Sequence, residues 1–190
     1  MPEPILKPLC ALGDYQPHTE NYSGVSIREN PDFAMASVAI RMGRDADFAP
    51  KAATLFGMAL PGPGDMSGAG DWSAFWTGPG QWMVTAPYAS HEDISRIVKT
   101  GLSDTASVTE QTDGWVRFDI EGPRAMDMFE RLSNVDVRTM KAGQATRTQV
   151  EHLGSFLLCH SAAMRFSLIT LRSGADSMHH ALMTAAKSLG

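Results

Sequence analysis

The 190-residue chain contains 43% apolar residues, enough to bury the core of one compact domain or of two small fused halves. Charged residues make up 19% and the net charge is -5, so the chain lacks the excess of positive charge that would attract nucleic acid or an anionic membrane. No segment approaches the ~20 apolar residues of a membrane span, and Cys10 and Cys159 fit neither a disulfide framework nor a CxxC spacing. We therefore expect a soluble, cytoplasmic protein that binds neither nucleic acid nor membrane.

The first 33 residues predict an extended N-terminal arm. Short apolar patches alternate there with Pro, Asn, Tyr and Gly, a pattern that supports no helix and at most a short strand near Val25 to Ile27. Segments of this kind become ordered when they lie along a partner. The arm would precede a single domain over residues 34–190.

Residues 34–106 predict a unit of mixed α and β structure. The expected elements are a strand at 36–41, a helix at 48–59, a hairpin at 73–85 and a helix at 94–102. Ser90 is the expected N-cap of the second helix, with Asp93 in its first turn. The glycine-rich segment 62–70 has no Lys-Ser or Lys-Thr pair and carries an acid, so we interpret it as a flexible loop and not as a phosphate site.

Residues 107–190 repeat this order. The expected elements are a strand at 115–120, a helix opened by Gly122-Pro123, a loop at 133–144, strands at 146–150, 155–159 and 166–171, and a last helix capped by Ser173. The recurring order predicts an α+β fold of two fused ferredoxin-like units, with helices packed on antiparallel sheets. The two pseudo-repeated halves would be about 34–106 and 107–190.

The sequence contains no recognisable catalytic constellation. The adjacent pairs Cys159-His160 and His179-His180 lack the spacing that metal ligands need on a helix or strand, although a site assembled from distant positions remains open. No GxSxG elbow is present, and Cys159 lies in an apolar run that predicts a buried, inert thiol. We therefore assign no catalytic, cofactor-binding or metal-binding residue to this chain.

Three stretches resemble the gamma subunits of heterotetrameric sarcosine oxidase. They are Trp76-Thr77-Gly78-Pro79-Gly80-Gln81-Trp82-Met83-Val84, the stretch from Thr112 to Ala125, and the segment from Arg165 to Leu182. The likeness spans roughly Val25 to the C-terminus. More distantly, Trp115 to Leu132 resembles the glycine-cleavage aminomethyltransferases and their folate-binding relatives, which implies an aminomethyltransferase folate-binding-domain-like fold.

The resemblance implies a structural, assembly role in a complex that oxidises sarcosine to glycine. Such a complex transfers the one-carbon unit to tetrahydrofolate, or releases it as formaldehyde, and forms hydrogen peroxide. FAD, FMN, NAD and tetrahydrofolate would be bound by the other subunits and none by this chain. The expected partners are the alpha, beta and delta subunits, chiefly the folate-binding region of the large alpha subunit.

A second hypothesis is a free-standing, folate-binding aminomethyltransferase-like enzyme. It requires an acid that faces a pterin pocket at the junction of the two halves, and Asp113, Asp119 and Glu121 are the candidates. Each of these acids is more simply explained as a strand or turn residue with its side chain in water. A third hypothesis, an interaction module unrelated to sarcosine, stays open because a fold does not determine its function.

Overall fold

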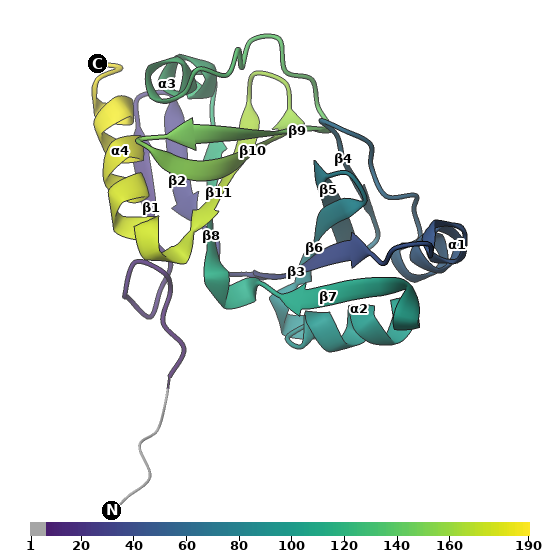
Figure 1. Cartoon of the computed structure of the whole chain (residues 1–190). Coiled ribbons are helices and arrows are strands. Elements are labelled where there is room, and N and C mark those ends of the chain that lie inside the picture. The colour runs from purple at the N-terminus through teal and green to yellow at the C-terminus, as the bar shows by residue number, and fades with distance from the viewer. Residues whose placement is uncertain (1–6) are drawn as a thin grey trace, which may run out of the picture.

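The computed structural model describes residues 7–190, which form an α+β fold with two antiparallel sheets. The helices are α1 (Asp45–Phe56), α2 (Ile94–Leu102), α3 (Ala125–Leu132) and α4 (Ala175–Lys187). The strands are β1 (Thr19–Tyr22), β2 (Val25–Glu29), β3 (Phe33–Ile40), β4 (Met66–Ala69), β5 (Trp72–Gly78), β6 (Gln81–Pro87), β7 (Ala106–Glu110), β8 (Trp115–Glu121), β9 (Gln144–Val150), β10 (Leu153–Ser161) and β11 (Arg165–Leu171). Figure 1 shows the helices on the outer sides of the molecule and the two sheets between them. Among the described residues, no helix is both long and apolar enough to cross a lipid bilayer.

The first unit is a five-stranded sheet of order β4-β5-β6-β3-β7 that is covered by α1 and α2. The strands β5, β6, β3 and β7 with their two helices give the ferredoxin-like arrangement, and β4 is an extra edge strand. Helix α2 buries Ile94, Val98 and Leu102, one residue per turn, against this sheet. The predicted N-cap Ser90 is wrong, because the carboxylate of Asp93 accepts the hydrogen bond from the backbone N–H of Arg96.

Two short strands of this unit were not foreseen from the sequence. Strand β4 lies inside the segment 62–70, which was expected to be only a loop, and pairs with β5. Strand β7 lies at the edge of the sheet, begins with the buried Ala106, continues with mostly exposed residues and pairs with β3. Both strands are short and form because a neighbouring strand pairs with them, so their own residues give only a weak prediction of β structure.

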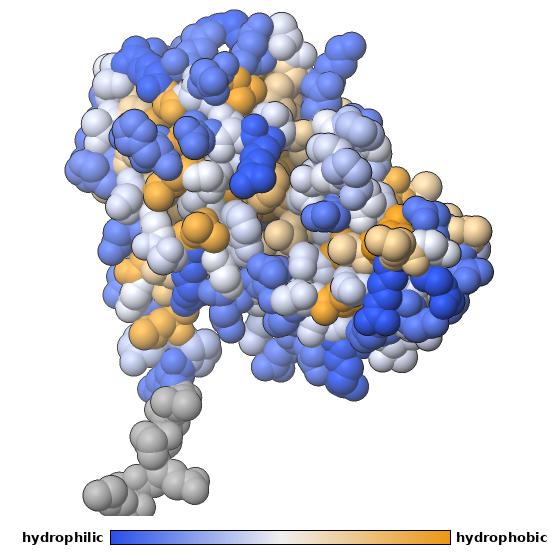
Figure 2. Space-filling model, in the orientation of Figure 1, coloured by the Kyte–Doolittle hydropathy of each residue, from blue (hydrophilic) through white to orange (hydrophobic). Residues whose placement is uncertain are grey.

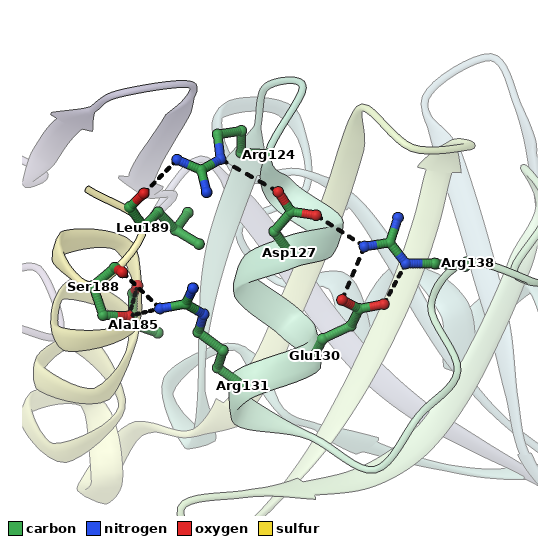
Figure 3. Close-up of polar contacts among 8 residues, drawn as sticks. All are labelled: Arg124, Asp127, Glu130, Arg131, Arg138, Ala185, Ser188 and Leu189. Atoms are coloured by element: carbon green, nitrogen blue, oxygen red, sulfur yellow. Dashed lines mark hydrogen bonds and ion pairs between the residues drawn. The ribbon is translucent and has the colours of Figure 1, made fainter.

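The second unit is a six-stranded sheet of order β1-β2-β8-β11-β10-β9 that is covered by α3 and α4. In Figure 3, Arg124, the residue before α3, and Arg131, within α3, both reach toward the end of α4. Arg131 donates to the carbonyl oxygen of Ser188 at 2.6 Å, and Arg124 donates to that of Leu189 at 2.5 Å. These guanidinium groups satisfy the carbonyls of the two residues that follow α4 and offset the negative end of the helix dipole. Helix α4 follows Gly174 and has no side-chain cap, so the predicted N-cap Ser173 is wrong.

The N-terminal segment is part of the second unit, which corrects the expected arm over residues 1–33. Strand β2 pairs with β8, and β1 pairs with β2, so the segment supplies the outer strands of this sheet. The side chain of Glu29 is 2% exposed and accepts hydrogen bonds from the backbone N–H groups of Leu12 and His18. Arg172 donates to the carbonyl oxygen of Leu9 at 2.7 Å. Residues 1–6 of the predicted arm lie outside the described residues.

Each sheet has one apolar core beneath its helices, and a third apolar cluster joins the faces of the two sheets that the helices leave free. Its buried members are Phe33, Met35, Phe75, Ala145, Phe156, Leu158 and Ile169. The rings of Phe75 and Phe156 lie 5.1 Å apart, and Trp115 lies 5.5 Å from Phe156. Backbone hydrogen bonds from Met66 to Gly143 and from Ala145 to Gly64 add a second connection between the units. The two units therefore share a buried interface.

Candidate functional site

The chain crosses between the two units twice, and a cavity opens where the crossings meet. The β2–β3 connection contributes Asn30 and Asp32, and the β7–β8 connection contributes Thr112 and Asp113. The cavity has a volume of about 350 Å³. This volume lies at the lower end of the range for small-molecule sites, and the junction of two units is a common location for such sites.

The charged groups that line the cavity are mainly acidic. Glu29, Asp32 and Asp113 contribute three carboxyl groups to its lining, against the single guanidinium of Arg172. The carboxylate of Glu29 already accepts two backbone N–H groups and holds the N-terminal loop. Burial, and secondly the nearby Glu29, raise the pKa of the Cys10 thiol at this site. The thiol is therefore protonated at neutral pH and is a poor nucleophile.

Exposed hydrophobic side chains gather around this cavity. Leu9, Tyr15 and Tyr88 line it and have exposed fractions of 47%, 65% and 40%. Leu171 is 47% exposed and pairs with Trp115, a further lining residue. We call these four exposed residues the junction rim. Figure 2 shows hydrophobic groups beside the first described residues, while most of the viewed face is hydrophilic.

A buried polar network occupies the open face of the six-stranded sheet. The carboxylate of Asp119 accepts hydrogen bonds from Asn30 at 2.6 Å, Arg117 at 2.6 Å and Ser167 at 2.5 Å. The Nε2 atom of His160 lies 2.7 Å from the hydroxyl of Ser167. Burial tends to raise the pKa of Asp119, but Arg117, Ser167 and Asn30 together hold it below its usual value. Burial first, and then the charge of Arg117, lower the pKa of His160 to about 4.

This network contains Ser, His and Asp, but its arrangement differs from that of a nucleophilic triad. In a triad the imidazole lies between the serine and the acid and removes the hydroxyl proton. Here the hydroxyl of Ser167 lies in the middle and donates a hydrogen bond to the carboxylate of Asp119. A carboxylate with a lowered pKa is a weak base, and the neutral imidazole of His160 is left to donate to the serine oxygen. The network therefore orders this face of the sheet and does not activate a nucleophile.

The three acids that the sequence analysis singled out do not share one site. Asp113 lines the junction cavity, Asp119 belongs to the buried network, and Glu121 is exposed at the far end of β8. A strand rise of ~3.3 Å per residue places the two ends of β8 about 20 Å apart. Of the three, Asp113 is the one that faces the junction of the two units.

Sequence reasoning missed most of the junction residues. Glu29, Tyr15 and Arg172 come from segments that were expected to be an arm or the start of a helix, and no motif marks them. Their proximity depends on the pairing of β2 with β8. The prediction for Cys159 fared better, since its side chain is buried and burial raises the pKa of its thiol.

Comparison with known proteins identifies the fold. No family model matches the sequence, and no curated protein matches it either. The structure is similar to a chain of the heterotetrameric sarcosine oxidase from Corynebacterium sp. U-96, solved in complex with pyrrole 2-carboxylate, with a TM-score of 0.77 and 17% identity. That similarity covers 89% of this chain and 87% of the other.

A second similar structure is the glycine cleavage system aminomethyltransferase T from Bartonella henselae, with a TM-score of 0.60 and 13% identity. It covers 85% of this chain and 46% of that enzyme, so the chain corresponds to about half of the enzyme's length. The two likenesses confirm the predicted fold class, an α+β structure of the aminomethyltransferase folate-binding-domain type. At these identities they establish the fold alone.

Proposed function

We propose that this chain is the gamma-type subunit of a heterotetrameric sarcosine oxidase and that its role is structural. One observation carries the proposal. The similarity to the sarcosine oxidase chain covers nearly the whole of both chains, whereas the similarity to the aminomethyltransferase stops at about half of that enzyme. The three stretches that resemble gamma subunits, including Trp76 to Val84, support the same assignment.

A structural role has a physical basis in the fold. A chain that shares the fold of a larger subunit's folate-binding region can pack on that region as a pseudo-symmetric partner. Obligate interfaces of this kind commonly bury more than ~2,000 Å² and are apolar at their centre. The junction rim offers two tyrosines and two leucines for such a centre. We place the contact with the alpha subunit there, and the beta and delta subunits complete the complex.

The chemistry of the complex belongs to its other subunits in this proposal. FAD, FMN, NAD and tetrahydrofolate are bound there, and the assembly converts sarcosine to glycine with one-carbon transfer to tetrahydrofolate and peroxide formation. The geometry of this chain agrees, because Ser167 is engaged by Asp119 and the thiol of Cys10 is protonated. Both cysteines are free, which suits a reducing cytoplasm.

Co-purification tests the proposal. The tagged chain is expressed with the alpha, beta and delta subunits, and the eluate is assayed for flavin absorbance and sarcosine-dependent peroxide. We expect a flavin-containing complex. The double variant Tyr88→Asp/Leu171→Asp should lose the partners, because two charges would be buried without a counter-ion. Met42→Asp is the matched control, since Met42 is fully exposed away from the rim.

The outcomes distinguish an error in the location of the contact surface from an error in the assignment of the chain as a subunit. If wild type and both variants retain the partners equally, the contact surface lies elsewhere on the chain. If the wild-type chain recovers none of the three subunits under conditions in which they assemble with each other, the assignment as a subunit is wrong.

The acidic junction cavity favours one alternative, a free-standing folate-binding aminomethyltransferase-like enzyme. Asp113 would accept hydrogen bonds from the N–H groups of a pterin in the cavity. Titration of the isolated chain with tetrahydrofolate decides the matter. Micromolar binding that is lost in Asp113→Asn would support the alternative, and absence of binding would remove it.

A further inference from the structure

Two histidines and a glutamate converge where the N-terminal hairpin meets the C-terminal helix. His18 and Glu20 lie two residues apart at and just before β1, so they point to the same face of the strand. His179 lies on α4, which packs against that hairpin. One possible ligand atom from each of the three side chains lies within 4.8 Å of the other two. Ligand atoms bound to one tetrahedral ion lie about 3.3 Å apart, so small rotations of these side chains would bring the three atoms to a common ion.

His179 is the member of this cluster that most needs a partner. Its Nε2 atom is buried and has no hydrogen-bond partner among the described residues. The ring stacks on Phe118 at 6.0 Å and meets the edge of the His18 ring at 5.7 Å, so its orientation is fixed. A buried polar atom of this kind calls for a ligand.

His18 already has the outer partner that metal-bound histidines use. Its Nε2 atom lies 2.7 Å from the carboxylate of Asp14. A carboxylate in this position fixes the tautomer and the ring orientation of a ligating histidine and increases its basicity. An isolated Asp14–His18 ion pair would explain the position of His18, but it would leave the Nε2 atom of His179 unpaired.

We propose that His18, Glu20 and His179 bind one divalent transition-metal ion of the Zn²⁺ class. Two imidazoles and one carboxylate suit Zn²⁺ and its first-row neighbours, whereas Mg²⁺ and Ca²⁺ prefer oxygen ligands alone. All three side chains are partly exposed, so a water molecule can complete the coordination. The ion would join β1 to α4 and so fasten the N-terminal hairpin to the C-terminal helix. This site is separate from the junction cavity and does not depend on the proposed function.

Calorimetric titration with Zn²⁺, and the visible absorption of bound Co²⁺, test the proposal. The full chain is used after removal of any histidine tag, because a tag would bind the same ions. We expect one ion per chain with micromolar or tighter affinity, and a rise in Tm when Zn²⁺ is added. Glu20→Gln and His179→Gln should each weaken binding by about 100-fold or more, and Asp14→Asn by about 10–100-fold. His180→Gln is the matched control, since His180 is the exposed neighbour on α4 and should leave the affinity unchanged.

Two results would overturn the proposal. One is the absence of stoichiometric binding to the wild-type chain at micromolar free Zn²⁺. The other is equal affinity in Glu20→Gln and His180→Gln. Glu20 lies on an edge strand, so its variant remains informative if His179→Gln folds poorly. Loss of the ion in Cys10→Ser with retention in Glu20→Gln would assign binding to the thiol and refute the site.

Discussion

Acidification from pH 7 to pH 5 should destabilise this protein through His160. Its imidazole is half-buried beside Ser167, and its pKa is lowered to about 4 by burial and by Arg117. Below about pH 6.5 the imidazole binds a proton in the unfolded chain, while in the folded protein it stays neutral down to about pH 4. Because the unfolded state then binds more protons, the free energy of unfolding falls as the pH falls through this range.

The magnitude follows from the two pKa values. For a fully buried imidazole the difference corresponds to ~2 kcal/mol of lost stability at pH 5. His160 keeps part of its surface in solvent, which reduces the expected loss to ~1 kcal/mol. Asp119 stays ionised at pH 5 because its pKa is lowered, so its contribution is lost only at more acidic pH. Burial also lowers the pKa of His179, so that residue contributes in the same direction between pH 7 and 5, and a variant of His160 is needed to separate the two contributions.

Urea unfolding at pH 7, 6 and 5, followed by far-UV circular dichroism, measures this loss. The variant His160→Gln keeps a donor for the Ser167 hydroxyl but cannot titrate, so its stability should change by ~1 kcal/mol less than that of wild type. His180→Gln removes an exposed histidine outside the network and should follow wild type. Equal losses in wild type and His160→Gln would refute the reasoning.

Three further predictions concern stability and can be measured by thermal or urea unfolding at pH 7. Gly122→Ala should cost ~3 kcal/mol of unfolding free energy, because Gly122 has φ +132° and a Cβ there would lie 2.3 Å from a backbone oxygen. Gly154→Ala is the control, since Gly154 has open space around it, and this variant should cost less than ~1 kcal/mol. Phe156→Ala should cost ~3–5 kcal/mol, since it removes a ring packed between the two sheets, and a smaller loss than ~1 kcal/mol would mean that the units do not depend on this contact. Arg131→Ala should cost ~1 kcal/mol by freeing the carbonyl of Ser188 at the end of α4, and an unchanged midpoint would show that the pair in Figure 3 contributes nothing.

Local sequence patterns were sufficient for the long elements that have a strong periodicity. The burial of Val116, Phe118 and Ile120 on one face of β8 follows directly from the alternation in the sequence. The same holds for the four-residue spacing of Ile94 and Val98 on α2. The buried face of such an element can be predicted from the element's own sequence, without knowledge of its partners in the fold.

Elements that depend on a distant partner could not be found in the same way. Strand β2 exists because β8, far later in the chain, offers it an open edge. The sequence indicated at most a short strand near Val25 to Ile27 within an extended arm, and it gave no sign that this strand joins the sheet of the second unit. The junction cavity and the cluster of His18, Glu20 and His179 both follow from this one pairing. Sequence reasoning placed Asp113 near the junction of the halves, but it could not separate it from Asp119 and Glu121.

Native mass spectrometry of the alpha, beta and delta subunits, expressed with and without this chain, tests the central claim most directly. The account predicts a complex that gains one copy of this 20.6 kDa chain, with flavin and sarcosine-dependent peroxide formation in the complex and neither in the isolated chain. A fully assembled, fully active flavoprotein that never incorporates the chain would contradict the account.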